Sequence, residues 1–231
     1  MRRNLLIALM CALLIVVLIF SIGASSEEKE KKPEKSEEIV SDPGDPNGPL
    51  ELDKSQMLSI EEITEPVSLS SISVYINEPC DEEWRTYYPS DWMYYANYAV
   101  ELADDKLYSW FGIDFISVAQ NVWYSDGNIN SLVDRLAEAR SEIGHTNGSD
   151  IMIAYTKQSA DAYGAGVIGQ GWSIVRWQGS GTDWKVTRHE TGHNYGLQHI
   201  GCSNCLINSS YTPDVICEYH YNQWDQNKYL Y

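Results

Sequence analysis

Basic residues are scarce in this chain. Its 231 residues include 16 Lys and Arg against 33 Asp and Glu, which gives a formal net charge of −17. A surface of that sign repels phosphates, so nucleic acid is not an expected partner. The simplest explanation of the acidity is solubility in an extracellular or salty medium. We expect the protein to be a monomer.

A phosphate-binding loop is also missing. Residues 162–177 contain Gly164, Gly166, Gly169 and Gly171, but no G-x-x-x-x-G-K-[ST] pattern is present and no helix is expected directly after these glycines. Glycine at this density weakens a strand interior but lets another backbone approach closely. The stretch is therefore predicted as an irregular edge strand.

One long apolar run stands at the start of the chain. Arg2 and Arg3 precede residues 5–20, which carry no charge, and the run continues weakly to residue 24. About 20 apolar residues can span a bilayer, whereas a signal peptide has a shorter apolar core and a cleavage site of small residues. Residues 1–25 are predicted as a signal peptide or an anchor, and we favour the anchor (residues 5–24). Both place the rest of the chain outside the cytoplasm, membrane-anchored or secreted.

The next segment has the composition of a linker. Residues 27–49 are mostly Glu, Lys, Pro, Gly and Asp, and they cannot bury enough apolar surface to fold. We predict a disordered acidic linker over residues 26–66, with a short propeptide as the alternative for its last part. Residues 67–231 remain, which is long enough for one domain with its own core.

Strands alternate with helices in that domain, which predicts an α/β fold with a mostly parallel sheet. The predicted strands cover residues 72–76, 113–123 and 150–155, and the predicted helices cover residues 90–111 and 130–143. The third strand is apolar throughout, so both of its faces should be buried. Asp126-Gly127-Asn128 is predicted as a turn. Calcium could bind there, but no further ligand pattern follows.

The strongest local pattern is H-E-x-x-H-x-x-G-x-x-H, which begins at His189. His189 and His193 are four residues apart, so on a helix they lie on one face and can bind the same ion. Gly196 can adopt a positive φ, end the helix and turn the chain, and His199 then returns as a third ligand. Three imidazoles suit zinc and leave a fourth position for a water, which Glu190 is placed to reach.

A chance origin of this pattern is improbable. A lone H-E-x-x-H occurs in unrelated helices, but the added Gly and third His are rarely found with it. With His at about 2% and Gly at about 7% of residues, a match in a chain this long has odds on the order of 1 in 10⁵. We therefore predict one catalytic zinc ion, whose bound water is activated by Glu190 as general base.

The pattern resembles the signature of the metzincin clan of zinc endopeptidases. The predicted order of strands and helices over residues 71–200 also matches that clan. The resemblance implies a reprolysin- or adamalysin-like enzyme, or a prokaryotic relative, that hydrolyses peptide bonds of extracellular proteins. It implies a zincin fold: a twisted, mostly parallel sheet with an antiparallel edge strand, long helices and an irregular C-terminal subdomain. Residues 67–231 would be the zinc metalloprotease catalytic domain, and a peptide or protein substrate would pair with the edge strand.

The methionine that gives the metzincin Met-turn its name is absent, because no methionine follows Met152. Residues 205–209, C-L-I-N-S, resemble the corresponding run with Ile207 in its place. By the resemblance, this residue packs beneath the metal site and does not bind zinc. Ile is apolar and close to Met in volume, so Ile207 is predicted to serve as the floor of the site.

Cysteines are few, five in all, and one of them lies in the apolar N-terminal run. The other four are Cys80, Cys202, Cys205 and Cys217. Their even number in an exported chain predicts two disulfides, with three possible pairings. Cys202-x-x-Cys205 also has the spacing of zinc ligands, and Cys217 with His220 could complete a second zinc site. Both interpretations remain open at this point.

Two other functions fit the same motif. A surface or adhesion module could bind the ion as a structural element, and a catalytically inactive relative of the protease could bind zinc without cleaving peptides. Glu190 argues against the first alternative, because a structural site needs no general base. Peptide cleavage with and without a chelator distinguishes both from a protease.

Overall fold

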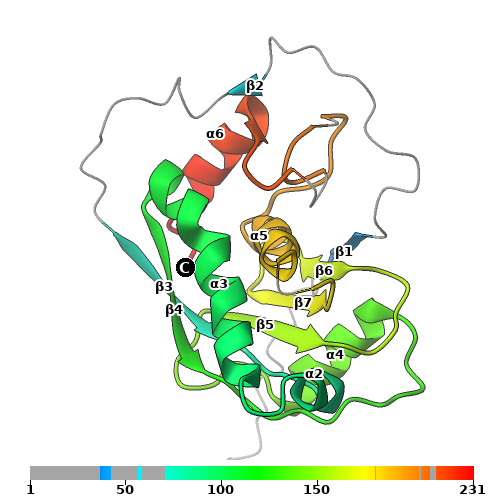
Figure 1. Cartoon of the computed structure of the whole chain (residues 1–231). Coiled ribbons are helices and arrows are strands. Elements are labelled where there is room, and N and C mark those ends of the chain that lie inside the picture. Colours follow the sequence, from blue (N-terminus) through cyan, green and yellow to red (C-terminus); the bar gives the residue numbers. More distant parts are fainter. Residues whose placement is uncertain (1–36, 43–56, 59–70, 180, 203, 209–211) are drawn as a thin grey trace, which may run out of the picture. The chain divides into compact units, whose positions relative to one another are not determined.

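The computed structural model describes residues 37–42, 57–58, 71–179, 181–202, 204–208 and 212–231 (Figure 1). The strands are β1 (Ile39–Asp42), β2 (Met57–Leu58), β3 (Ile72–Asn77), β4 (Ile113–Ala119), β5 (Ile151–Thr156), β6 (Gly164–Val167), β7 (Trp172–Arg176) and β8 (Ile216–Cys217). The helices are α2 (Glu82–Tyr87), α3 (Trp92–Phe111), α4 (Leu132–Glu142), α5 (Asp183–Asn194) and α6 (Glu218–Asn227).

The main sheet has six strands in the order β1-β6-β7-β5-β3-β4. Strands β7, β5, β3 and β4 are parallel to one another, whereas β6 is antiparallel to β7 and β1 is antiparallel to β6. A short second sheet joins β2 to β8. The sheet is therefore mostly parallel, as the alternation of strands and helices predicts. Of its six strands, β6 runs in the opposite direction to the other five.

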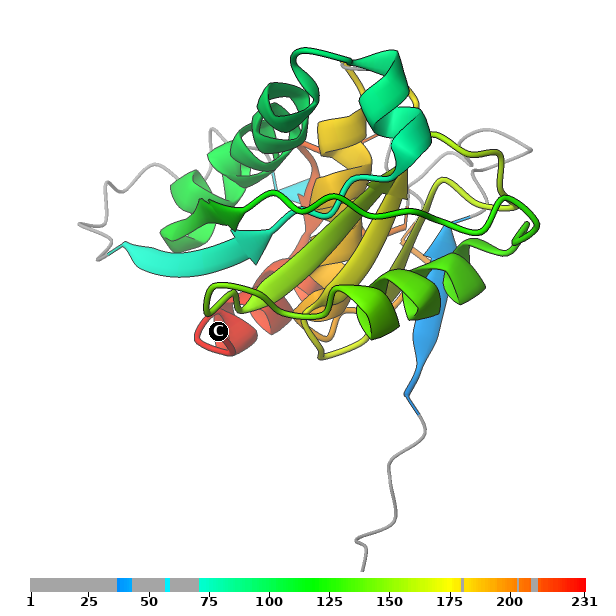
Figure 2. The same ribbon diagram turned by 90° about the horizontal axis from the view of Figure 1, so that it is seen from below.

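Helices cover both faces of this sheet. Successive residues of a strand point to opposite faces. Ile151 and Ile153 of β5 accordingly join the core that contains apolar side chains of α3 and α5, while Met152 and Ala154 join a second core with the apolar face of α4. In Figure 2, α4 lies on the face of the sheet opposite to α3 and α5. The prediction that this strand is buried on both faces is confirmed, because all six of its residues are buried.

The predicted helices form close to their expected bounds. α3 ends where Gly112 takes a left-handed conformation (φ 73°) that accepts no β-carbon easily. α4 begins after Ser131, whose hydroxyl accepts a hydrogen bond from the Asp134 amide. The short helix α2 and the C-terminal helix α6 are not predicted from the sequence. Among the described residues after His199, strands and helices begin at β8. The predicted turn is present, and Asp126 Oδ1 closes it by accepting from the Asn128 amide at 2.9 Å.

Two strands lie in the stretch predicted as a linker. β1 pairs with β6, and β2 pairs with β8, so residues 39–42 and 57–58 depart from the predicted disorder. The described residues from Glu37 onward form one compact unit. Within the described residues no helix is long and apolar enough to cross a membrane. The predicted signal peptide or anchor lies outside the described residues.

Candidate metal centre

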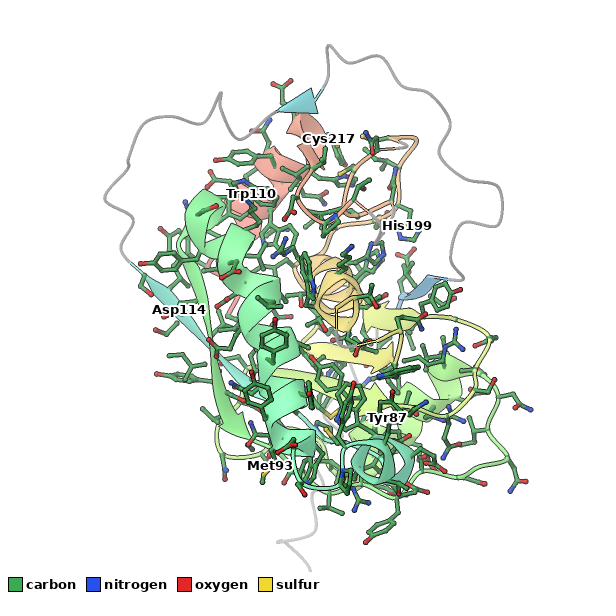
Figure 3. The ribbon with its side chains drawn as sticks, in the orientation of Figure 1. Tyr87, Met93, Trp110, Asp114, His199 and Cys217 are labelled. Atoms are coloured by element: carbon green, nitrogen blue, oxygen red, sulfur yellow. The ribbon has the colours of Figure 1, made fainter. Side chains whose placement is uncertain are left out.

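Three histidines meet at the C-terminal end of α5. His189 and His193 lie one turn apart on this helix, and their Nε2 atoms are 3.2 Å apart. Gly196, with φ 89°, turns the chain directly after the helix. His199 then comes back with its Nε2 atom 3.1 Å from that of His189. The structure thus brings together all three histidines of the motif, and Figure 3 labels His199 on the segment that follows α5.

Backbone carbonyls fix the orientation of the two helical rings. His189 Nδ1 lies 2.5 Å from Leu206 O, and His193 Nδ1 lies 2.7 Å from Leu197 O. A carbonyl only accepts hydrogen bonds, so each Nδ1 carries the proton and each Nε2 presents a lone pair to the shared centre. Lone pairs that face each other at this distance repel, and a cation between them removes the conflict. The donor set therefore fits a metal ion.

Burial keeps the first of these rings neutral. His189 is fully buried, and this desolvation, with His199 as a weaker influence, lowers the pKa of His189 to about 3. The neutral imidazole is the form that binds a metal, and a hydrogen bond from the other ring nitrogen orients it further. His193 is buried as well, whereas His199 is exposed, so the site opens to solvent on the side of His199.

Glu190 lies next in the chain to His189 and is fully buried against β6. A β-carbon at Gly164 would overlap Glu190 Oε1, and one at Gly166 would stand 2.9 Å from Glu190 O and 3.1 Å from Oε2. Only glycine leaves room for the carboxylate at these two positions. The glycine-rich sequence allows a close approach, as predicted, but the approaching group is Glu190 of the chain itself.

We expect Gly164→Ala to displace the Glu190 carboxylate and to lower peptide hydrolysis by at least tenfold while zinc remains bound. The reason is geometric, since Glu190 is the predicted general base and a misplaced base gives up part of a factor of about 10²–10⁴. Gly181→Ala is the matched control, because a β-carbon there meets nothing within 4 Å. Zinc content and cleavage rate should be measured for both. Equal activities of the two variants would contradict this role of Gly164.

The floor of the site is apolar. Ile207 is fully buried in the core cluster that contains Trp224 and Tyr195. Its Cδ1 occupies the space that a β-carbon at Gly192 of α5 would need. The preceding residue, Leu206, supplies the carbonyl that orients His189. The residues around Ile207 thus support α5 from below at the level of the histidines.

Ile207→Met should change the free energy of unfolding by less than about 1.5 kcal/mol, because the swap nearly conserves volume in an apolar pocket. Ile207→Asp should prevent stable folding or zinc binding, because it buries an uncompensated carboxylate. Thermal unfolding and zinc content of both variants provide the measurement. An Asp variant that folds and cleaves normally would show that Ile207 is not the floor.

Arg188, which the sequence analysis did not single out, anchors α5. Its guanidinium is buried and donates to Ala103 O and Leu102 O of α3, both at 2.6 Å. It also donates to Pro213 O and Asp214 Oδ1, both at 2.9 Å. This side chain ties the metal-site helix to α3 and to the segment before β8. The only signal in the sequence is a basic residue directly before the motif.

The outer edge of β6 is occupied. β1 runs antiparallel along it, with Val40 opposite Gly166, and Ile168 N donates to Glu38 O at 2.9 Å. Glu38 also accepts a hydrogen bond at 2.9 Å from Gln198, the residue before His199. The prediction that the glycine-rich strand is the edge of the sheet is therefore wrong for this structure, because a strand from the predicted linker lies beyond it.

The cysteines do not form the predicted disulfides. Cys80, Cys202, Cys205 and Cys217 are all free thiols. Cys80 is buried in the core after β3, and its backbone forms isolated parallel β-bridges with Val122 and Tyr155. The other three lie close to one another (Figure 3 labels Cys217, at the start of α6). An even number of cysteines does not show which of them lie close together. The prediction of two disulfides fails because one of the four thiols lies apart from the other three.

Comparisons with known proteins add a family and some distant structural likenesses. Residues 70–229 match Metallo-peptidase family M12. No curated protein matches the chain. Archaemetzincin from Methanopyrus kandleri is 15% identical, with a TM-score of 0.45 over 68% of this chain and 96% of its own. Metalloproteinase-II from Bacteroides fragilis is 12% identical, with a TM-score of 0.48 over 71% of this chain and 55% of its own.

A third likeness is to a chain from the structure of a chaperone–substrate complex. The identity is 16% and the TM-score 0.48, over 58% of this chain. This chain spans 25% of the length of that one. Because all three TM-scores are below 0.5, these likenesses carry no argument about function.

Proposed function

This chain belongs to metallopeptidase family M12, and we propose that it cleaves proteins outside the cytoplasm with Glu190 as the general base. Family membership makes the protein a metalloendopeptidase and implies zinc. The observation that carries the assignment of residues is the convergence of three Nε2 atoms, from α5 and from the turn after it, beside a buried glutamate. The extracytoplasmic location is supported by the basic residues that precede the apolar N-terminal run.

His189, His193 and His199 would hold the zinc ion. When bound, zinc acts as a Lewis acid that acidifies a coordinated water and polarises the scissile carbonyl. The carbonyls of Leu206 and Leu197 keep the protons of two rings on Nδ1, so that Nε2 stays a ligand. This fixed tautomer holds the ligands ready before any ion arrives, which lowers the ordering cost of binding.

Glu190 moves the proton. Its carboxylate lies in the space above Gly164 and Gly166, on the β6 side of α5. There it accepts a proton from the attacking water and passes it to the leaving amine. β6 contacts the helix at Glu190, and the Ile207 side chain contacts it at Gly192.

Casein or gelatin cleavage by the purified chain tests the proposal directly. The protein should cleave these substrates, lose the activity with a chelator and regain it when zinc is added back. A protein that binds zinc but cleaves neither these substrates nor a broad peptide library would be an inactive zinc-binding module.

β1 lies where a peptide substrate would pair with β6. A peptide that adds to the outer edge of β6 forms main-chain hydrogen bonds with it, as in other cases of strand addition. β1 makes such bonds in the same place, and Glu38 reaches Gln198 beside His199. A substrate that pairs with β6 therefore has to displace β1, and residues 37–42 compete with it.

Removal of residues 1–42 should lower KM on the order of tenfold relative to removal of residues 1–36, which leaves β1 in place. The net gain of a few strand hydrogen bonds is about 0.5–1.5 kcal/mol each before the cost of ordering, and 1.4 kcal/mol corresponds to a factor of ten. Both variants keep β3 to α6, and equal melting temperatures would verify that they are comparable. An unchanged KM would mean that substrates do not use this edge.

A further inference from the structure

Near the histidine site lies a second cluster of side chains whose types can bind a metal. Cys202 and Cys205 come from the segment after His199, and Cys217 ends β8. Their Sγ atoms lie within 4.8 Å of one another. His220, in the first turn of α6, places Nδ1 3.2 Å from both Cys205 Sγ and Cys217 Sγ. Three thiols and one imidazole thus face a common point. Two residues separate Cys202 from Cys205, and two residues separate Cys217 from His220.

The ring of His220 is oriented as a ligand. Its Nε2 lies 2.9 Å from Gln198 O, which can only accept, so Nε2 carries the proton. The lone pair of Nδ1 is therefore directed at the sulfur atoms. His220 is fully buried, and a backbone carbonyl as the partner of the far nitrogen is the usual support of a metal-binding histidine.

We propose that Cys202, Cys205, Cys217 and His220 bind a second zinc ion, which has a structural role. Four-coordinate sites of three Cys and one His are typical of structural zinc, and soft thiolates select it over calcium or magnesium. Zn–S bonds of about 2.3 Å in a tetrahedron place sulfur atoms about 3.8 Å apart and a sulfur and a nitrogen about 3.6 Å apart. The two sulfur–nitrogen separations of 3.2 Å and the sulfur atoms within 4.8 Å of one another are compatible with this arrangement.

A disulfide explains the cluster less well. Three neighbouring thiols leave one unpaired whichever two combine, and Cys80 lies apart in the core after β3. A disulfide would also give the lone pair of His220 Nδ1 no cation and no strong donor. Bound zinc uses all four groups, and coordination keeps the thiolates reduced in an oxidising compartment.

This second site holds the segment that completes the first. Cys205 precedes Leu206, whose carbonyl orients His189, and Ile207, which packs on Gly192. His220 binds the carbonyl of Gln198, the residue before His199. Both ends of the segment that follows α5 are thereby fixed to the same ion. The zinc at this site acts as a positioning element for the histidines and takes no part in the reaction.

Metal analysis of the full chain, purified under reducing conditions, tests the proposal. Wild type should contain two zinc ions per chain. His193→Ala should retain one, which a thiol-modifying mercurial should release. Cys202→Ser, at a half-buried ligand, should lose one zinc and lower the cleavage rate, whereas Cys80→Ala, at a buried cysteine outside the cluster, should keep both. A His193→Ala protein without zinc, with Cys80→Ala and wild type each holding one, would overturn it.

Cobalt provides a second readout, which reports directly whether thiolates bind the metal. Co²⁺ in place of zinc should give the intense near-ultraviolet absorption of cobalt–thiolate bonds, which a site of three histidines cannot produce. That absorption should persist in His193→Ala and weaken in Cys202→Ser. A cobalt-loaded protein without the thiolate absorption, or a mapped disulfide between any two of the three cysteines, would also overturn the second site while leaving the proposed protease activity intact.

Discussion

Glu190→Gln should retain its zinc and its melting temperature while peptide hydrolysis falls by a factor of about 10²–10⁴, the usual worth of a general base. Glutamine keeps the size and most of the hydrogen-bonding shape of the side chain, so it fits the same space above Gly164 and Gly166. It cannot accept the proton of water at neutral pH. The loss should therefore affect catalysis and leave binding of the ion unchanged.

Three measurements on this variant separate the roles that Glu190 could have. Zinc content shows whether it is a ligand, the melting temperature shows whether it is a structural prop, and the cleavage rate shows whether it is the base. Glu142→Gln is a matched control, because Glu142 is an exposed glutamate on α4, on the opposite face of the sheet. Wild-type cleavage rates in Glu190→Gln would rule out the mechanism, and loss of zinc would make Glu190 a ligand.

His193→Ala should behave differently and lose zinc from the histidine site together with all detectable peptide cleavage. The substitution removes a buried ligand from the middle of the set and leaves two imidazoles, too few for a tight site. Metal binding stabilises only the folded state, so the melting temperature should also fall. The wild-type melting temperature should rise with added zinc more steeply than that of the variant.

His145→Ala controls for the loss of a histidine as such. His145 is exposed and packs on Trp172, with ring centroids 3.8 Å apart, and it is not part of the histidine cluster. It should keep both zinc binding and cleavage. If His193→Ala still bound zinc at the histidine site as tightly as wild type, the three histidines would not be the ligand set that the geometry indicates.

Much of the site could be predicted because its spacing is local. Residues four apart on one helix always share a face, so His189 and His193 had to point to one centre once α5 formed. The turn at Gly196 and the return of His199 follow from the next few residues. Likewise the apolar run of β5 and its flanking helices predict a buried parallel strand without knowledge of any partner.

Other predictions failed where the outcome depended on distant residues. Even parity among four cysteines says nothing about which thiols meet, since a disulfide needs α-carbons within about 7 Å and only the fold sets that distance. The polar composition of residues 26–66 predicts disorder, yet β1 is ordered by the unpaired edge of β6, more than a hundred residues later in the chain. A short strand can be ordered by pairing with the edge of a sheet even when its own composition does not favour folding.

The sequence by itself determined the three histidines, the glutamate beside them and the alternation of strands and helices, because each depends on positions a few residues apart. Only the tertiary structure decided that Glu190 lies over Gly164 and Gly166, that Leu206 O orients His189, and that His220 joins the three cysteines. These contacts unite segments that are separated in the chain. Their geometry is set by how helices pack on a twisted sheet, and no local spacing encodes it.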